Sequence, residues 1–177
     1  MDRGRVVVVA LLALLFFAAC GSDEKGPNPP GQPPPVTLVI NEFMARNVAT
    51  LADEFNEFDD WLELWNRGPD TQSTGGLYLT DDYGIPNRWA LPETTLAAGS
   101  HLIIWADGQP EQGTWHASFR LEVNGEEIAL NQITAFGTVL VDSVTYGAQQ
   151  ADTSYARFPD GGAWMQDPTP TPVAANQ

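Results

Sequence analysis

Apolar and polar residues alternate in short runs along most of the chain after residue 35. The runs are separated by Gly, Pro, Asn and Asp, which is typical of β-strands joined by turns. We expect strands over 36–43, 60–66, 76–80, 88–91, 101–106, 118–123, 127–131, 139–146 and 154–158. Short strands at this spacing predict an all-β fold, an antiparallel β-sandwich.

Local signals add detail to this expectation. Asn124 and Gly125 lie between two expected strands and are typical of a tight hairpin turn. In the strand over 60–66, the two leucines fall on one face, and the tryptophans and Glu63 fall on the other. Residues 48–58 come nearest to a helical period and predict no more than a short turn.

The first segment has a different pattern. Two arginines precede an apolar run over residues 6–19, which ends on two alanines and Cys20. A basic start, an apolar run and small residues at its end predict a secretory signal peptide over residues 1–19. The run is shorter than the roughly 20 apolar residues that a membrane-spanning helix needs.

The end of this run, Phe17-Ala18-Ala19-Cys20, resembles the lipobox of bacterial lipoproteins, with Phe17 where an aliphatic residue is usual. The resemblance implies that Cys20 becomes the mature N-terminus and carries acyl chains such as palmitate, which anchor the protein in a membrane. Gly21 follows, instead of the aspartate that retains enteric lipoproteins at the inner membrane, so we expect the outer membrane. An ordinary signal peptide with an incidental cysteine is the alternative.

Proline and glycine divide the rest of the chain into a tether, a domain and a tail. Residues 20–35 are rich in proline and lack large apolar residues, which predicts an extended spacer. Residues 36–166 have the length of a single domain. The Pro-rich residues 167–177 are expected either to lie flat or to fray.

Charge and cysteine content exclude some classes of function. The chain has 8 basic and 23 acidic residues and a net charge of −15 at pH 7. Such a surface repels phosphate backbones, so nucleic acid is not expected as a partner. Cys20 is the single cysteine, so the exported domain is expected to be stable through its core alone, without a disulfide.

An acidic loop is the best candidate for a site. Asp53, Asn56, Glu57 and Asp59 offer oxygen ligands in one short stretch, and calcium binds six to eight oxygens. Their spacing differs from the EF-hand pattern. The alternative is a solvated acidic loop that binds no ion. Apart from this calcium hypothesis, the sequence indicates no cofactor.

Signals for catalysis are weak. Glu42 and Glu63 lie on strands that are expected to pair, which makes an envelope glycoside hydrolase a remote alternative. His101 and His116 are not spaced like zinc ligands. No serine has the sequence setting of a nucleophile. We therefore expect a protein without enzymatic activity.

Aromatic residues raise another alternative. They either pack in the core or form an exposed platform on which sugars stack, as in a carbohydrate-binding or adhesion module, with calcium as a further aid. The residues in question are Trp65, Trp89, Trp105, Trp115, Trp164, Tyr78 and Tyr83.

Several stretches occur in an order that is specific to one family. They are INEFMA (40–45), DWLELWN (60–66), GLYLTDD (76–82), WALP (89–92), LAAGSHLIIWA (96–106), DSVTYG (142–147) and QADTSYARFPDG (150–161). In this order they resemble the bacterial form of the lamin-tail domain. Residues 168–176 are similar to the segment that closes these domains, with Val173 where a glycine is common and Thr171 and Pro172 as a small insertion.

The resemblance implies an immunoglobulin-like β-sandwich. In nuclear lamins the domain mediates binding to proteins and, in some accounts, to DNA. Bacterial relatives are usually exported, and no enzymatic activity is established for the module. We therefore expect a non-catalytic lipoprotein of the bacterial cell envelope that displays a binding or scaffolding domain to an envelope protein or glycan.

Overall fold

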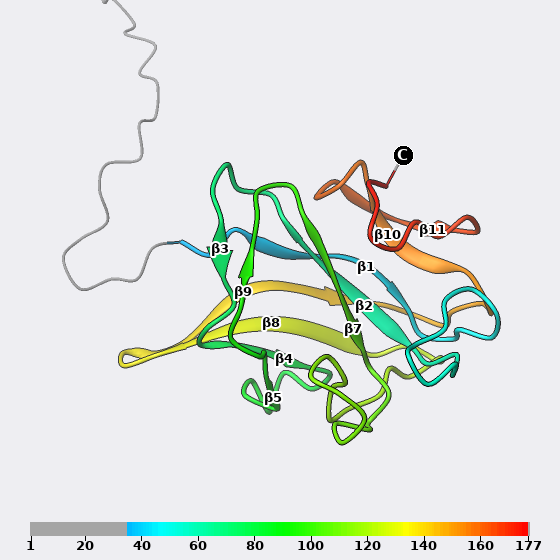
Figure 1. Ribbon diagram of the computed structural model, residues 1–177, viewed down its shortest axis with the longest axis horizontal. Helices are drawn as coiled ribbons and strands as arrows, with labels where there is room; N and C mark the ends of the chain where they lie inside the picture. The colour runs from blue at the N-terminus through cyan, green and yellow to red at the C-terminus, as the bar shows by residue number, and fades with distance from the viewer. Residues whose placement is uncertain (1–34, 177) are drawn as a thin grey trace, which may run out of the picture. The chain divides into compact units, whose positions relative to one another are not determined.

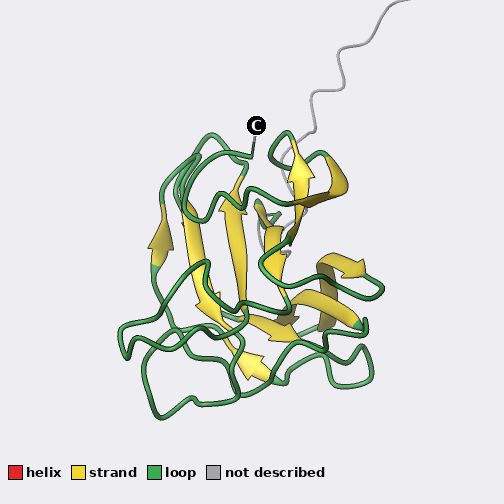
Figure 2. Ribbon diagram, turned by 90° about the vertical axis from the view of Figure 1, so that its right-hand side faces the viewer, coloured by secondary structure: helices red, strands yellow, loops and turns green. Residues whose placement is uncertain are grey.

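The computed structural model describes residues 35–176. The expected signal peptide over 1–19, the lipidation site Cys20 and the expected tether up to residue 34 lie outside these residues. The described part consists of strands and loops, without a helix (Figures 1 and 2). Accordingly, residues 35–176 contain no helix that is long and apolar enough to cross a membrane.

The strands pair into three antiparallel sheets. One sheet has the order β11–β10–β1–β2–β7, a second has the order β5–β4–β8–β9, and β3 pairs with β6. The strands are β1 (Leu38–Met44), β2 (Trp61–Asn66), β3 (Gln72–Ser73), β4 (Leu77–Thr80), β5 (Trp89–Ala90), β6 (Thr95–Leu96), β7 (His101–Trp105), β8 (Glu127–Thr134), β9 (Gly137–Thr145), β10 (Ser154–Phe158) and β11 (Ala163–Asp167).

The core lies between the two larger sheets. Leu62, Leu64 and Ile104 from the β2 and β7 strands pack in one cluster with Leu79 and Leu130 from β4 and β8, and all five are fully buried. The alternating apolar residues of both sheets therefore face each other, as the sequence pattern predicts. This confirms the all-β, immunoglobulin-like antiparallel β-sandwich.

A β-bulge in β1 decides which of its side chains face the core. The register of β1 against β2 shifts between Ile40 and Glu42, so Asn41 is the extra residue. Before the bulge Ile40 belongs to the main core, and after it Phe43 does, at a spacing of three residues instead of two. Glu42 is therefore directed to the opposite face of the sheet from Phe43.

Two sequence expectations about residues 118–125 are wrong. The segment 118–123 is not a strand, although Phe119 and Leu121 are buried, because its backbone pairs only at the isolated bridge between Asp107 and Arg120. Gly125 does close a turn, with its N–H donating to Glu122 O at 3.0 Å, but that turn joins no pair of strands. The sequence-based set of strands also omits β3, β6 and β11.

The end of the chain lies flat against the sandwich, which is one of the two outcomes expected for it. Residues 168–176, here called the C-terminal segment, follow β11 and return over β1 and β10 (Figure 1). Asn176 is buried, and its side-chain amide donates to Asn41 O at 3.3 Å and to Arg157 O at 3.0 Å. The segment thereby covers the outer face of the first sheet.

Candidate functional site

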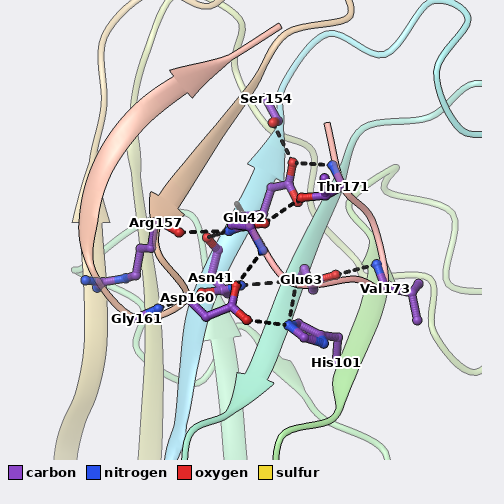
Figure 3. Close-up of polar contacts among 11 residues, drawn as sticks. Asn41, Glu42, Glu63, His101, Ser154, Arg157, Asp160, Gly161, Thr171 and Val173 are labelled. Carbon is purple, nitrogen blue, oxygen red and sulfur yellow. Dashed lines mark hydrogen bonds and ion pairs between the residues drawn. The ribbon is translucent and has the colours of Figure 1, made fainter. Parts of the chain in front are cut away.

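Glu42 and Glu63 lie side by side on that outer face. They are cross-strand partners in the pairing of β1 with β2, which the sequence analysis expected. Both residues are fully buried, and Figure 3 shows them among side chains and backbone of β10 and the C-terminal segment. The two carboxylates are therefore paired but closed to solvent.

Hydrogen bonds from the chain's C-terminal part satisfy both carboxylates. Ser154 Oγ donates to Glu42 Oε1 at 2.5 Å, and the N–H of Thr171 donates to the same oxygen at 3.2 Å. The N–H of Val173 donates to Glu63 Oε2 at 2.6 Å. These contacts hold the C-terminal segment on the sheet (Figure 3).

Asp160 extends this network toward His101. Its Oδ1 accepts hydrogen bonds from Asn41 Nδ2 at 3.0 Å and from the N–H of Asn176 at 2.9 Å. Its Oδ2 lies 3.3 Å from His101 Nε2, which is also 3.8 Å from Glu63 Oε1. We call these residues the carboxylate network: Asn41, Glu42, Glu63, His101, Ser154, Asp160, Thr171, Val173 and Asn176.

Burial changes the charge state of this network. It raises the pKa of Glu63 to about 8, and the hydrogen bonds from Val173 and Asn41 offset only part of that effect. Burial likewise raises the pKa of Glu42. A substrate has no open path to either carboxylate, which weighs against the glycoside hydrolase alternative. The network instead fastens the end of the chain.

The acidic loop is organised by its first residue. Asp53 Oδ1 accepts hydrogen bonds from the N–H groups of Phe55 and Glu57, at 2.9 and 2.8 Å. The N–H of Asp53 donates in turn to Glu57 O at 3.0 Å. Asn56 lies at the tip with a positive φ of 63°, a conformation that Asn tolerates better than most residues. The loop is therefore a defined turn in which Asp53 Oδ2, unlike Oδ1, accepts no hydrogen bond.

Three of the four residues in the calcium hypothesis come together. Asp53, Glu57 and Asp59 each place a carboxylate oxygen within 4.8 Å of the others, and Asn56 is exposed at the tip of the same loop. Burial raises the pKa of Asp59, and the neighbouring carboxylates of Asp107, Glu57 and Asp53 raise it further. Calcium binding by this group stays a prediction.

His116 reaches the same loop from a distant part of the chain. Its ring is fully buried and stacks on that of Trp105, with 6.3 Å between the centroids. Nδ1 is hydrogen-bonded to Asp107 Oδ2, and Nε2 lies 3.3 Å from Glu54 Oε1. Asp53, Glu54 and His116 form a second group whose ligand atoms lie within 4.8 Å of one another.

Opposing influences act on the His116 imidazole. Burial lowers the pKa of His116, but the hydrogen bonds and charges of Asp107 and Glu54 outweigh burial and leave the pKa above its ordinary value. The surroundings therefore favour a positive charge at this ring. Together, the acidic loop and His116 are the candidate site.

Sequence reasoning found the loop but not the histidine. The acidic residues are neighbours in sequence, whereas His116 joins them through a bridge to Trp105 at the end of β7. No spacing motif connects two segments that meet only in the folded chain. The sequence offered an indirect signal. His116 stands just before a stretch in which every second residue is apolar and buried, beginning with Ala117 and Phe119.

The aromatic residues do not form the exposed platform of the carbohydrate alternative. Trp105 is buried, and Trp89, Trp115 and Trp164 pack against the core. Of the seven rings in that hypothesis, Tyr83 is the one that is exposed. These exposures favour the alternative of core and edge packing, in which the rings supply apolar area to a sandwich that has to bury its core without disulfides.

One family model matches the chain. The model, described as Lamin Tail Domain, matches residues 32–148. The match covers β1 to β9 and ends before β10, so Ser154, Asp160 and the C-terminal segment lie beyond it. No curated protein and no solved structure matches the chain.

Proposed function

Since the chain belongs to the lamin tail domain family, we propose that it is a non-catalytic binding or scaffolding module of the bacterial cell envelope. A lipid on Cys20 holds it at the outer membrane in this proposal, and the domain presents its surface to an envelope partner. The observation that carries the proposal is the family match over most of an immunoglobulin-like sandwich.

The use of polar side chains inside the domain supports a non-catalytic role. Glu42 and Glu63, the carboxylate pair of the hydrolase alternative, accept hydrogen bonds from Thr171 and Val173 beneath the C-terminal segment. Their oxygens are thus occupied by contacts that a folded sandwich needs. A catalytic pair has to face a cleft that admits substrate.

The hairpin of β8 and β9 supports a binding role. It extends beyond the rest of its sheet in Figure 1, and it carries Phe136, Val139 and Leu140 as exposed apolar side chains. Val139 and Leu140 are consecutive in β9 and lie on opposite faces of the hairpin, and Phe136 lies in its turn. Exposed apolar area of this kind is typical of interaction sites. We call these residues the hairpin tip.

The proposal is tested by crosslinking the full chain in intact envelopes and identifying the proteins that it captures. Wild type is compared with a variant that carries Phe136→Ser and Leu140→Ser, since both side chains are exposed and their loss leaves the core intact. We expect a defined partner with wild type and a marked loss with the variant.

Two results would contradict the proposal. Glycan-array binding without a protein partner favours the carbohydrate alternative. Hydrolysis of envelope glycans by wild type that is abolished by Glu63→Gln favours the hydrolase alternative, because Gln keeps the shape of Glu63 and removes its acid.

A further inference from the structure

Several buried side-chain atoms without a hydrogen-bond partner gather at the acidic loop. They are Asp53 Oδ2, Asp59 Oδ2, Gln112 Oε1 and His116 Nε2. Gln112 belongs to this place because its Nε2 donates to Glu57 Oε2 at 2.7 Å. Buried polar atoms are nearly always hydrogen-bonded, so several unpartnered acceptors at one place indicate a ligand that they share.

The surroundings of His116 Nε2 indicate the charge of that ligand. Its side chain is fully buried, and the hydrogen bond from Nδ1 to Asp107 leaves Nε2 directed toward Glu54 Oε1. This contact has two explanations: either Nε2 carries a proton and pairs with Glu54, or Nε2 is unprotonated and shares a bound cation with Glu54. The arginine–carboxylate ion pairs among residues 35–176, Arg88–Asp81 and Arg157–Asp142, are elsewhere. A proton on His116 leaves Asp53 Oδ2 and Asp59 Oδ2 unpartnered, and those two oxygens favour the bound cation.

We propose that Asp53, Glu54 and His116 bind a divalent transition-metal ion of the zinc class. Their ligand atoms already lie within 4.8 Å of one another, and Glu54 is exposed and free to adjust. Asp107 holds the imidazole by Nδ1, as carboxylates do behind most histidine ligands of metals. Three protein ligands leave a coordination position for water.

The chemistry of the ligand set distinguishes this site from the calcium hypothesis. Imidazole nitrogen suits zinc and similar ions, whereas calcium takes oxygen ligands. Glu54 and His116 belong only to the zinc group, Glu57 and Asp59 belong only to the all-oxygen group, and Asp53 belongs to both. A bound zinc ion links the loop to the segment that follows β7.

The test is zinc titration of the full chain after treatment with a chelator, followed by calorimetry and thermal unfolding. We expect saturable binding and a rise in Tm, because an ion that binds only the folded state stabilises it. Glu54→Gln is the test variant, since Glu54 is exposed, and Glu57→Gln is its matched control on the same loop. We expect Glu54→Gln to weaken zinc binding by about tenfold or more and Glu57→Gln to change it by less than about twofold.

A second measurement identifies the nitrogen ligand without a substitution. In long-range ¹H–¹⁵N NMR spectra, zinc is expected to shift the Nε2 resonance of His116 and to leave that of His101 in place. The chain has 2 histidines, so the two resonances provide their own control.

Results of three kinds overturn the proposal. The first is wild type that binds no zinc, which leaves His116 in a metal-free ion pair with Glu54. The second is zinc binding that Glu57→Gln weakens as much as Glu54→Gln does, or a His116 Nε2 resonance that zinc does not move. The third is calcium binding that only Glu57→Gln abolishes, which assigns the ion to the all-oxygen group.

Discussion

Val173 has a backbone conformation that is unfavourable for its side chain. Its φ is 62°, in the left-handed region, where a β-branched residue is a rare outlier. The conformation directs the N–H of Val173 at Glu63 Oε2, 2.6 Å away. The strain is therefore retained by a contact that satisfies a buried carboxylate.

This strain predicts a stabilising substitution. Val173→Gly removes the left-handed penalty of about 1–2 kcal/mol and keeps the N–H, at the cost of added freedom in the unfolded chain. Val173 is exposed, so little packing is lost. We expect a net gain of up to about 1 kcal/mol in the free energy of unfolding, measured with denaturant. The matched control, Val48→Gly at another exposed valine, should give no gain.

The raised pKa of Glu63 predicts how the free energy of unfolding depends on pH. Burial raises its pKa from the ordinary 4.5 to about 8 in the folded protein. Between these two values the folded state keeps a proton that the unfolded state releases, so the free energy of unfolding falls as pH rises. Each pKa unit corresponds to about 1.4 kcal/mol.

Glu63→Gln is expected to flatten this dependence, because Gln stays neutral at every pH. The measurement is denaturant unfolding at a series of pH values from about 4.5 to about 8.5, chosen to span the titration. Glu93→Gln, at an exposed glutamate, is the control and should keep the slope of wild type. An equal slope for Glu63→Gln and wild type would show that Glu63 is charged in the folded protein throughout.

At the scale of elements, alternation of apolar residues locates most strands but does not report their pairing. The pattern places β2, β7 and β10 within a residue or so of their observed bounds. It fails at 118–123 because burial of Phe119 and Leu121 comes from packing, whereas a strand also needs a partner backbone. It omits β11, an edge strand with mostly exposed residues, because that strand depends on pairing with β10.

The sequence analysis did not predict the structural role of the C-terminal segment. It has no strand or helix pattern, yet it supplies Thr171 and Val173 as donors to two buried carboxylates. Removal of these donors leaves Glu42 with the Ser154 hydroxyl and Glu63 with the Asn41 amide as remaining donors, so one oxygen of each residue loses hydrogen bonds. Each unsatisfied buried group of this kind costs about 1–3 kcal/mol.

Truncation after Asp167 is therefore expected to lower the free energy of unfolding by about 2–4 kcal/mol, as measured with denaturant at neutral pH. The same truncation in a variant with Glu42→Gln and Glu63→Gln should cost less, since each Gln presents one acceptor oxygen where Glu presents two, so fewer acceptors lose their donors. Equal costs in both backgrounds would mean that the segment stabilises the sandwich by apolar cover instead of by these hydrogen bonds.

At the scale of the molecule, the proposed function requires that the domain be held at a membrane. In the proposal, the lipid on Cys20, the single cysteine, anchors the protein in the membrane. Residues 35–176 contain no helix that could span one. Cys20→Ser should shift the protein from the membrane fraction to the soluble fraction, because two or more acyl chains give stable anchoring. Fractionation of cells with immunoblotting measures this. Protein that still needs detergent for extraction would contradict the lipid anchor.

The sequence by itself determined the fold class and the family of this protein. Both depend on local features, namely short alternating runs and motifs in a fixed order, and local features can be read without knowing which strands pair. For the same reason the sequence located the acidic loop, whose members Asp53, Glu57 and Asp59 are neighbours along the chain.

Only the tertiary structure decided which polar residues meet. The bulge at Asn41 directs Glu42 to the face of Glu63, and the C-terminal segment then closes over both. Packing beside β7 carries His116 to the acidic loop. Such contacts join residues far apart in sequence, and they arise because buried polar groups have to find partners wherever the fold provides them.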